Sequence, residues 1–174
     1  GDVQWMTAGR GIIHSELPHP DFYDSGGVMH GFQIWVNLPA KDKMMQPRYQ
    51  DIPSDELPVV ESVDGKVWAK VVAGEAMGAK AVIDTVIPIQ FIHYRMKEDS
   101  NLTHKISSDL NGMIYMFGGQ GEVSGKVIED GQLIIKTPLG EIEEQAPIAF
   151  QGETQVEAAW KIDGNKISFQ LGSY

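Results

Sequence analysis

The stretch "GFQIWVNL", residues 31–38, alternates between apolar and more polar side chains along its whole length. The apolar positions of one face are Phe32, Ile34, Val36 and Leu38. The opposite face carries Gln33, Trp35 and Asn37. Because successive side chains of a strand point to opposite faces, this period of two predicts a half-buried β-strand.

The same period of two recurs along the rest of the chain. Further runs of this kind cover residues 66–74, 86–96, 112–117, 122–129, 132–137, 154–160 and 166–171. Turn signals such as Asp64-Gly65 and Asp130-Gly131 separate them. Many short strands at this spacing predict an all-β sandwich or barrel. A helix is expected only at residues 53–58, where Ser54 would cap a single turn.

Proline divides the chain into two expected units. Residues 39–58 contain four prolines and no alternation, which favours a connection, because proline cannot donate to a central ladder. The sequence therefore predicts a partial N-terminal unit with its connection at 1–58 and a complete β-barrel at 59–174. Residues 1–38 hold too few strands to close a barrel alone.

Composition excludes several classes of protein. The 174 residues carry a net charge of -10 and no basic run, so direct nucleic-acid binding is disfavoured. Cysteine is absent, which leaves His, Asp and Glu as the available metal ligands. No apolar window is long enough to span a membrane, and the first residues lack the order of a signal peptide. We expect a soluble, cytoplasmic protein.

The stretch "GRGIIHSE", residues 9–16, holds the candidate metal ligands His14 and Glu16. On a strand, residues i and i+2 share a face, so these two side chains would project together. An imidazole beside a carboxylate supplies two corners of a non-haem Fe(II) site. From residue types alone, however, a solvated pair at the end of a strand is the commoner interpretation.

Two longer stretches give a more specific indication. "GDVQWMTAGRGIIHSELP" (1–18) and "HGFQIWVNLPAKDKMMQPRYQ" (30–50) resemble the pirin family of the cupin superfamily. Gly11 and His14 stand where the second cupin motif has its G-x-x-H. The remainder, with "VVAGEAMG" (71–78) and "AFQGETQVEA" (149–158), resembles the C-terminal cupin domain more loosely. The resemblance implies jelly-roll barrels: here a complete C-terminal barrel and a partial N-terminal one.

The resemblance also implies where a metal would bind. Pirins hold one iron in the N-terminal barrel through three histidines and one glutamate. His14 matches the third histidine, and Glu16 matches the glutamate. The other two ligands belong to an H-x-H motif that precedes Gly1 in the family, and no His-x-His occurs in this chain. The chain is therefore expected to carry half of an Fe(II) site.

The other histidines are not expected to complete that site. His19 lies in a loop with Asp21 and Asp24, where a substitute ligand is conceivable and a solvated polar loop is the commoner interpretation. The remaining three, expected to be structural or exposed, are His30, His93 and His104.

Two functional hypotheses follow from the resemblance. In the first, the complete protein is an Fe(II) dioxygenase of the quercetin 2,3-dioxygenase type that acts on a flavonol-like molecule, with Glu16 as the catalytic base. The chain as given, with half of the ligands, is expected to be inactive. In the second, the chain is a truncated or degenerate pirin-like coregulator that retains its second barrel as a non-catalytic module for protein partners.

The N-terminal strands also predict self-association. With few neighbouring strands, they would present open edges and an apolar face. The side chains of this face are Val3, Trp5, Ile12, Phe32 and Ile34. We expect a homodimer or a higher oligomer in which these segments cover one another.

Overall fold

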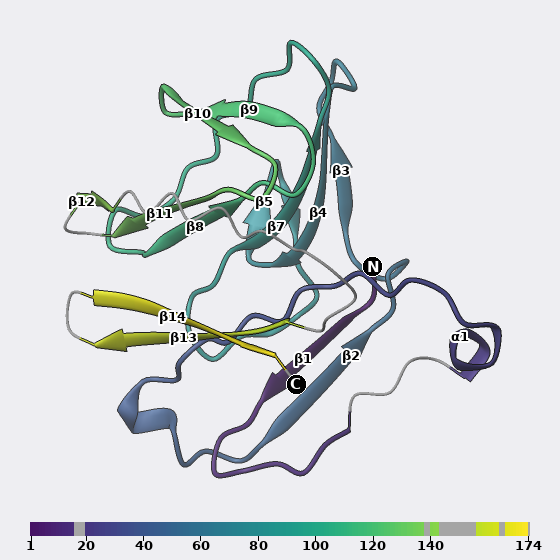
Figure 1. The fold of residues 1–174 in the computed structure, drawn as a ribbon, viewed down its shortest axis with the longest axis vertical. Coiled ribbons are helices and arrows are strands. Elements are labelled where there is room, and N and C mark those ends of the chain that lie inside the picture. Colours follow the sequence, from purple (N-terminus) through teal and green to yellow (C-terminus); the bar gives the residue numbers. More distant parts are fainter. Residues whose placement is uncertain (16–19, 138–139, 143–155, 164–165, 174) are drawn as a thin grey trace. The chain divides into compact units, whose positions relative to one another are not determined.

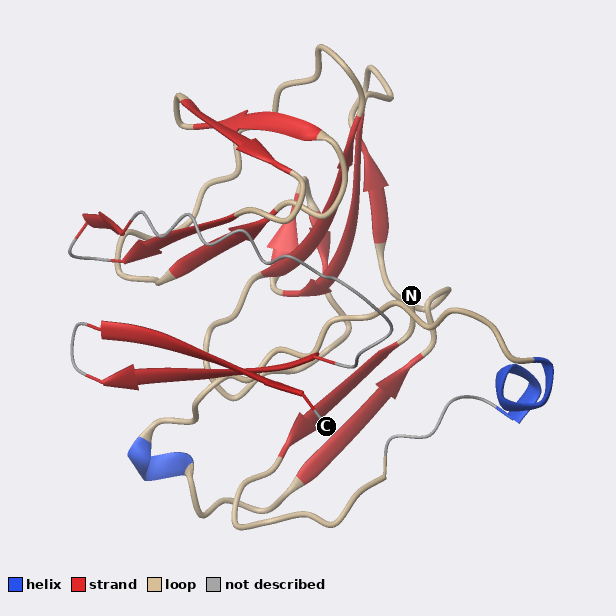
Figure 2. Cartoon of the chain, viewed as in Figure 1, coloured by secondary structure: helices blue, strands red, loops and turns tan. Residues whose placement is uncertain are grey.

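The structure, a computed structural model, describes residues 1–15, 20–137, 140–142, 156–163 and 166–173. Strands make up almost all of the regular secondary structure of these residues, as Figure 2 shows, so the all-β prediction is confirmed. The strands are β1 (Val3–Thr7), β2 (Arg48–Ile52), β3 (Val59–Glu61), β4 (Val67–Ala73), β5 (Glu75–Ala76), β6 (Ala79–Lys80), β7 (Phe91–Met96), β8 (Gly112–Tyr115), β9 (Gln120–Val123), β10 (Lys126–Glu129), β11 (Leu133–Thr137), β12 (Gly140–Ile142), β13 (Val156–Asp163) and β14 (Lys166–Ser173). The helices are α1 (Pro20–Ser25) and the 3-10 turn η1 (Ala40–Asp42). Among the described residues, no helix has the length and apolar character needed to cross a membrane.

The chain divides into two compact units, which are described separately. The first unit contains residues 1–104 and 158–171, and the second contains residues 105–157 and 172–174. This division reflects spatial proximity, and the domain boundary near residue 58 stays a prediction.

Strands β1 and β2 form an antiparallel pair within the first unit (Figure 1). Val3 lies opposite Ile52, and Thr7 lies opposite Arg48. β2 therefore runs inside the segment that was expected to be only a connection, and that expectation is wrong. Pro47 and Pro53 flank β2 on either side, so these prolines bound the strand without interrupting its ladder.

The antiparallel sheet β3-β4-β7 holds much of the core of the first unit. On the central strand β4, Val67, Ala69 and Val71 are buried on one face, as the period of two predicts. A bulge then places Val72 and Ala73 together opposite Phe91.

The bulge directs a second set of apolar side chains into contact. Val72 is buried in a cluster with Leu57 and Ile83. Partly buried side chains that pack against this cluster are Val3, Trp5, Ile52 and Phe91. The expectation that Val3 and Trp5 belong to an exposed apolar face is therefore wrong. Side chains of the β1–β2 pair thus pack against the end of the sheet that carries Val72.

The second unit contains the hairpin β9–β10 and the sheet β12-β11-β8. The hairpin turns at Ser124 and Gly125, which both have positive φ, at 50° and 84°. Two consecutive positive φ values are typical of the tight turns that match strand twist. The run 122–129, expected to be one strand, is therefore interrupted by a turn and belongs to both β9 and β10.

Two other local predictions are wrong. Residues 31–38 lie in none of the described strands, and Phe32 and Trp35 are 50% and 63% exposed. Alternation makes a segment suitable for a strand, but a ladder also needs a neighbouring strand to pair with, and none of the described sheets includes this segment. Residues 53–58 form a turn in place of a helix, in which the Glu56 amide donates to the Pro53 carbonyl oxygen at 3.1 Å, and helix α1 lies at Pro20–Ser25, where no helix was expected.

Candidate functional site

The segment that leads to His14 is fixed to the chain that precedes β2. The Arg10 amide donates to the Met45 carbonyl oxygen at 3.0 Å, and the Arg10 guanidinium donates to Gln46 Oε1 at 2.5 Å. Gly9 has φ of 50°, and a Cβ there would lie 2.3 Å from the Met45 oxygen. Only glycine satisfies both the conformation and the close approach. The backbone contacts of Gly9 and Arg10 with Met45 therefore fix the point from which the chain leads to His14.

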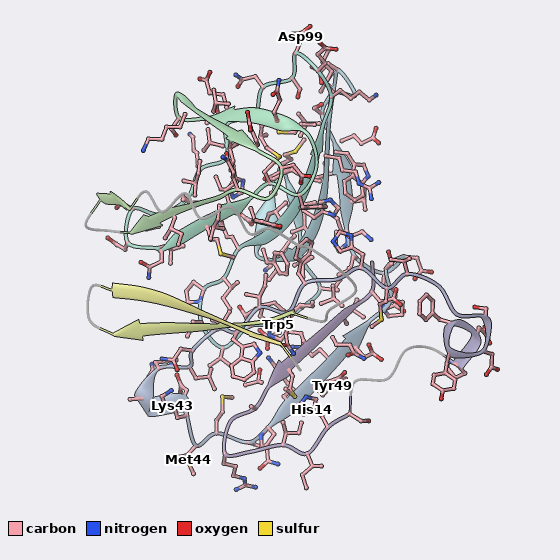
Figure 3. All side chains as sticks on the ribbon, in the orientation of Figure 1. Trp5, His14, Lys43, Met44, Tyr49 and Asp99 are labelled. Carbon is pink, nitrogen blue, oxygen red and sulfur yellow. The ribbon has the colours of Figure 1, made fainter. Side chains whose placement is uncertain are left out.

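Beyond this anchor, His14 lies on an exposed segment outside any strand. The expectation that a strand carries His14 and Glu16 on one face is wrong for residues 11–15, because β1 ends at Thr7. Glu16 and His19 lie outside the described residues. Figure 3 labels His14 together with Trp5 of β1 and Tyr49 of β2. The structure thus gives the location of His14, and the role of His14 and Glu16 as metal ligands stays a prediction.

No other described residues complete a metal site. Within the described ranges, no three His, Asp or Glu side chains lie close enough to hold a metal ion. His30 lies on an exposed segment, with its ring 5.5 Å from that of Phe32. The described part of the chain therefore does not by itself fit the four-ligand iron site that the resemblance implies.

His104 belongs to a polar chain within the first unit. Its Nδ1 lies 3.0 Å from the Tyr94 hydroxyl, and its Nε2 lies 2.7 Å from Gln90 Oε1. Burial raises the pKa of Tyr94, which keeps the phenol protonated. These contacts fix the segment after β7 against that strand.

His93 has a different environment on the opposite face of β7. Its ring meets Trp68 edge to face at 5.4 Å, and Arg95 lies 4.8 Å from the Trp68 ring centroid. Burial lowers the pKa of His93, and the charges of Arg95 and Lys70 lower it further. This grouping is not visible in the sequence as a motif, because its cations come from two strands that are far apart in the chain. Alternation within 66–74 and 86–96, combined with antiparallel pairing of the two runs, is the signal that would have found it.

An ion pair connects β2 to the loop before β7. Arg48 Nη1 donates to Asp84 Oδ2 at 2.7 Å, and Arg48 Nη2 donates to the Asp84 carbonyl oxygen at 2.5 Å. Gln50 donates to the same carbonyl oxygen at 3.0 Å and accepts from the Asp84 amide at 3.1 Å. These contacts hold the loop that contains Asp84 against β2, and their role is structural.

Comparisons with known proteins identify the class to which this architecture belongs. The fold matches the crystal structure of GK1651 from Geobacillus kaustophilus with a TM-score of 0.68 and 29% identity, over 85% of this chain and 55% of that one. It also matches quercetin 2,3-dioxygenase from Acinetobacter baumannii with a TM-score of 0.59 and 28% identity, over 78% of this chain and 47% of that one. The chain is an all-β protein of the cupin class.

Sequence comparisons narrow the class to a family. The pirin family model matches residues 1–36. The chain is 41% identical over 121 residues to a pirin-like protein of Solanum lycopersicum, covering 70% of this chain and 39% of that protein. It is 39% identical over 119 residues to human pirin, covering 68% of this chain and 39% of pirin. The chain belongs to the pirin family.

Two further findings describe the extent of the match. The chain spans about two fifths of the length of the curated relatives it matches. A second family model, a domain of unknown function named DUF7948, matches residues 116–174. The stretch 149–158, which is part of the looser resemblance to the C-terminal cupin domain, lies within that second match.

Proposed function

We propose that this chain supplies His14 and Glu16 to a pirin-type Fe(II) site whose remaining ligands lie outside the described residues. One structural neighbour, a quercetin 2,3-dioxygenase, is a cupin protein that is 28% identical to this chain. This similarity supports the assignment. The pirin match over residues 1–36 includes both His14 and Glu16. Imidazole and carboxylate are the ligand types that non-haem iron oxygenases use.

In the complete site, iron would supply Lewis acidity and an open position for oxygen. The contribution of this chain would be to hold the metal and, through Glu16, to accept a proton from a flavonol hydroxyl. The isolated chain, with two of the four ligands, is expected to bind iron weakly and to turn over no flavonol.

Iron retention tests the proposal. We would load the purified chain with Fe(II) under anaerobic conditions, remove weakly bound metal stepwise, and measure iron by mass spectrometry. His14→Ala and Glu16→Ala are expected to abolish the weak binding, whereas the matched control His30→Ala is expected to leave it unchanged. Equal retention by all four proteins would contradict the metal role of this segment.

The alternative is a non-catalytic module that acts through protein partners. The observation in its favour is the exposed apolar surface of residues 28–36, where Val28, Met29 and Trp35 are 92%, 65% and 63% exposed. Contiguous apolar exposure of this kind is typical of an interaction site. Under this alternative, loss of both His14 and Glu16 would leave partner binding intact.

A further inference from the structure

One face of the sheet β3-β4-β7 carries several cations around one tryptophan. Alternate residues of β4 and of the chain just before it share one face: Lys66, Trp68 and Lys70. The residues opposite them on β7 and just after it are Lys97, Arg95 and His93. We call these six side chains the basic face. All of them are at least partly exposed.

Contacts fix the geometry of the basic face. Trp68 lies between the His93 ring and the Arg95 guanidinium, at 5.4 Å and 4.8 Å between centres. Lys70 donates to the Ser54 hydroxyl, and Lys66 donates to the Asp99 carbonyl oxygen at 3.4 Å. Figure 3 labels Asp99 on the loop that follows β7. A rigid tryptophan and an arginine at the centre of a patch are the residue types that dominate binding energy at interfaces.

The charge of the basic face is opposite to that of the whole protein. Four of its side chains are cations, whereas the net charge of the chain is -10. Glu61 on β3 lies opposite Trp68 and is the nearest carboxylate in the ladder. Glu98 and Asp99 follow Lys97, and Asp64 lies in the turn before β4. These carboxylates limit the positive area to a short stretch. Burial is the main cause of the lowered pKa of His93, and the charges of Arg95 and Lys70 lower this pKa further.

We propose that the basic face is a docking site for a short acidic segment of a partner protein in extended conformation. Side chains at alternate positions of an extended peptide repeat at about 6.6 Å, which is the spacing of Lys66, Trp68 and Lys70 along β4. Carboxylates at positions i and i+4 of such a peptide would meet Lys66 and Lys70, and an apolar side chain at position i+2 would contact Trp68. This inference is independent of the metal site.

Other anionic partners fit less well. A nucleic acid carries charge at every phosphate, and its binding grows with the number of phosphates that a basic track neutralises. The flanking carboxylates interrupt such a track, and the net negative charge of the protein repels a long polyanion. A short acidic peptide avoids both costs.

Fluorescence anisotropy of a labelled Glu-Thr-Leu-Thr-Glu peptide tests the proposal with the full chain. We expect binding at low ionic strength that weakens as salt is raised, and none by the same peptide with Gln in place of Glu. The double variant Arg95→Glu/Lys97→Glu is expected to weaken binding about tenfold or more. The control Lys41→Glu/Lys105→Glu makes the same change in net charge at exposed positions elsewhere and is expected to change affinity less than about twofold.

Several results would overturn the proposal. These are absence of peptide binding at low salt, equal losses in the two double variants, or tighter binding of a single-stranded oligonucleotide or of anionic vesicles than of the peptide. Circular dichroism would verify that each variant is folded. Should Arg95→Glu/Lys97→Glu fail to fold, Arg95→Gln/Lys97→Gln takes its place, and unchanged affinity in that variant would equally refute the docking site.

Discussion

At the scale of single residues, Gly9 determines how the chain reaches His14. Its positive φ and the 2.3 Å approach to the Met45 oxygen leave no space for a side chain. We expect Gly9→Ala to lower the free energy of unfolding by roughly 2 kcal/mol or more. Gly65→Ala is the matched control, because Gly65 has φ of 64° and open space around its Cβ position. Urea denaturation that gave equal losses in both variants would show that the contact with Met45 has no energetic weight.

His93 links stability to pH. Its pKa is lowered in the folded protein by burial, by Arg95 and by Lys70, from an ordinary value of 6.5. The unfolded chain therefore binds the proton more tightly, so stability is highest above pH 6.5 and declines as pH falls through the folded pKa. His93→Gln is expected to reduce this decline below about pH 6.5, as measured by urea midpoints. His30→Gln, at an exposed histidine, is the control.

At the scale of elements, Arg48 connects β2 to the loop that holds Asp84. The two hydrogen bonds from its guanidinium join two segments that are 36 residues apart. Because Asp84 is largely exposed, we expect Arg48→Ala to cost only about 1 kcal/mol. Arg48→Lys keeps the charge, loses the paired geometry and should recover less than half of that loss. Thermal melts compare the three proteins, and full recovery by lysine would show that charge alone matters.

At the scale of elements, the alternation of apolar and polar residues predicted some strands correctly and others wrongly. The alternation in "KVWAKVVAG" (66–74) correctly indicated β4, because its inner face is buried whichever strands lie beside it. The equally clear alternation in residues 31–38 gave a wrong prediction, since pairing depends on which strand lies alongside and not on the segment itself. The motif around His14 was visible in the sequence, whereas the basic face depends on the antiparallel register of β4 and β7 and required the structure.

At the scale of the whole molecule, the exposed apolar side chains of residues 28–36 favour self-association. We propose that residues 28–36 cover one another in a homodimer or higher oligomer, because burying Val28, Met29 and Trp35 removes apolar area from water. Light scattering at micromolar concentration should give a mass above that of one chain. Trp35→Ser/Val28→Ser should shift it toward the monomer. The control, Val63→Ser, changes an exposed apolar side chain outside this segment. A monomeric wild-type chain would contradict this proposal.

The bulge in β4 also limits how this sequence can diverge in length. Deleting Val72 would restore a regular ladder, since Ala73 would follow Val71 directly opposite β7. The smaller alanine would then stand where Val72 now fills the space between Leu57 and Ile83, which would leave a cavity. A shortening that makes the strand more regular would thus weaken the protein. Among relatives that keep this core, we expect β4 to vary in residue type more readily than in length.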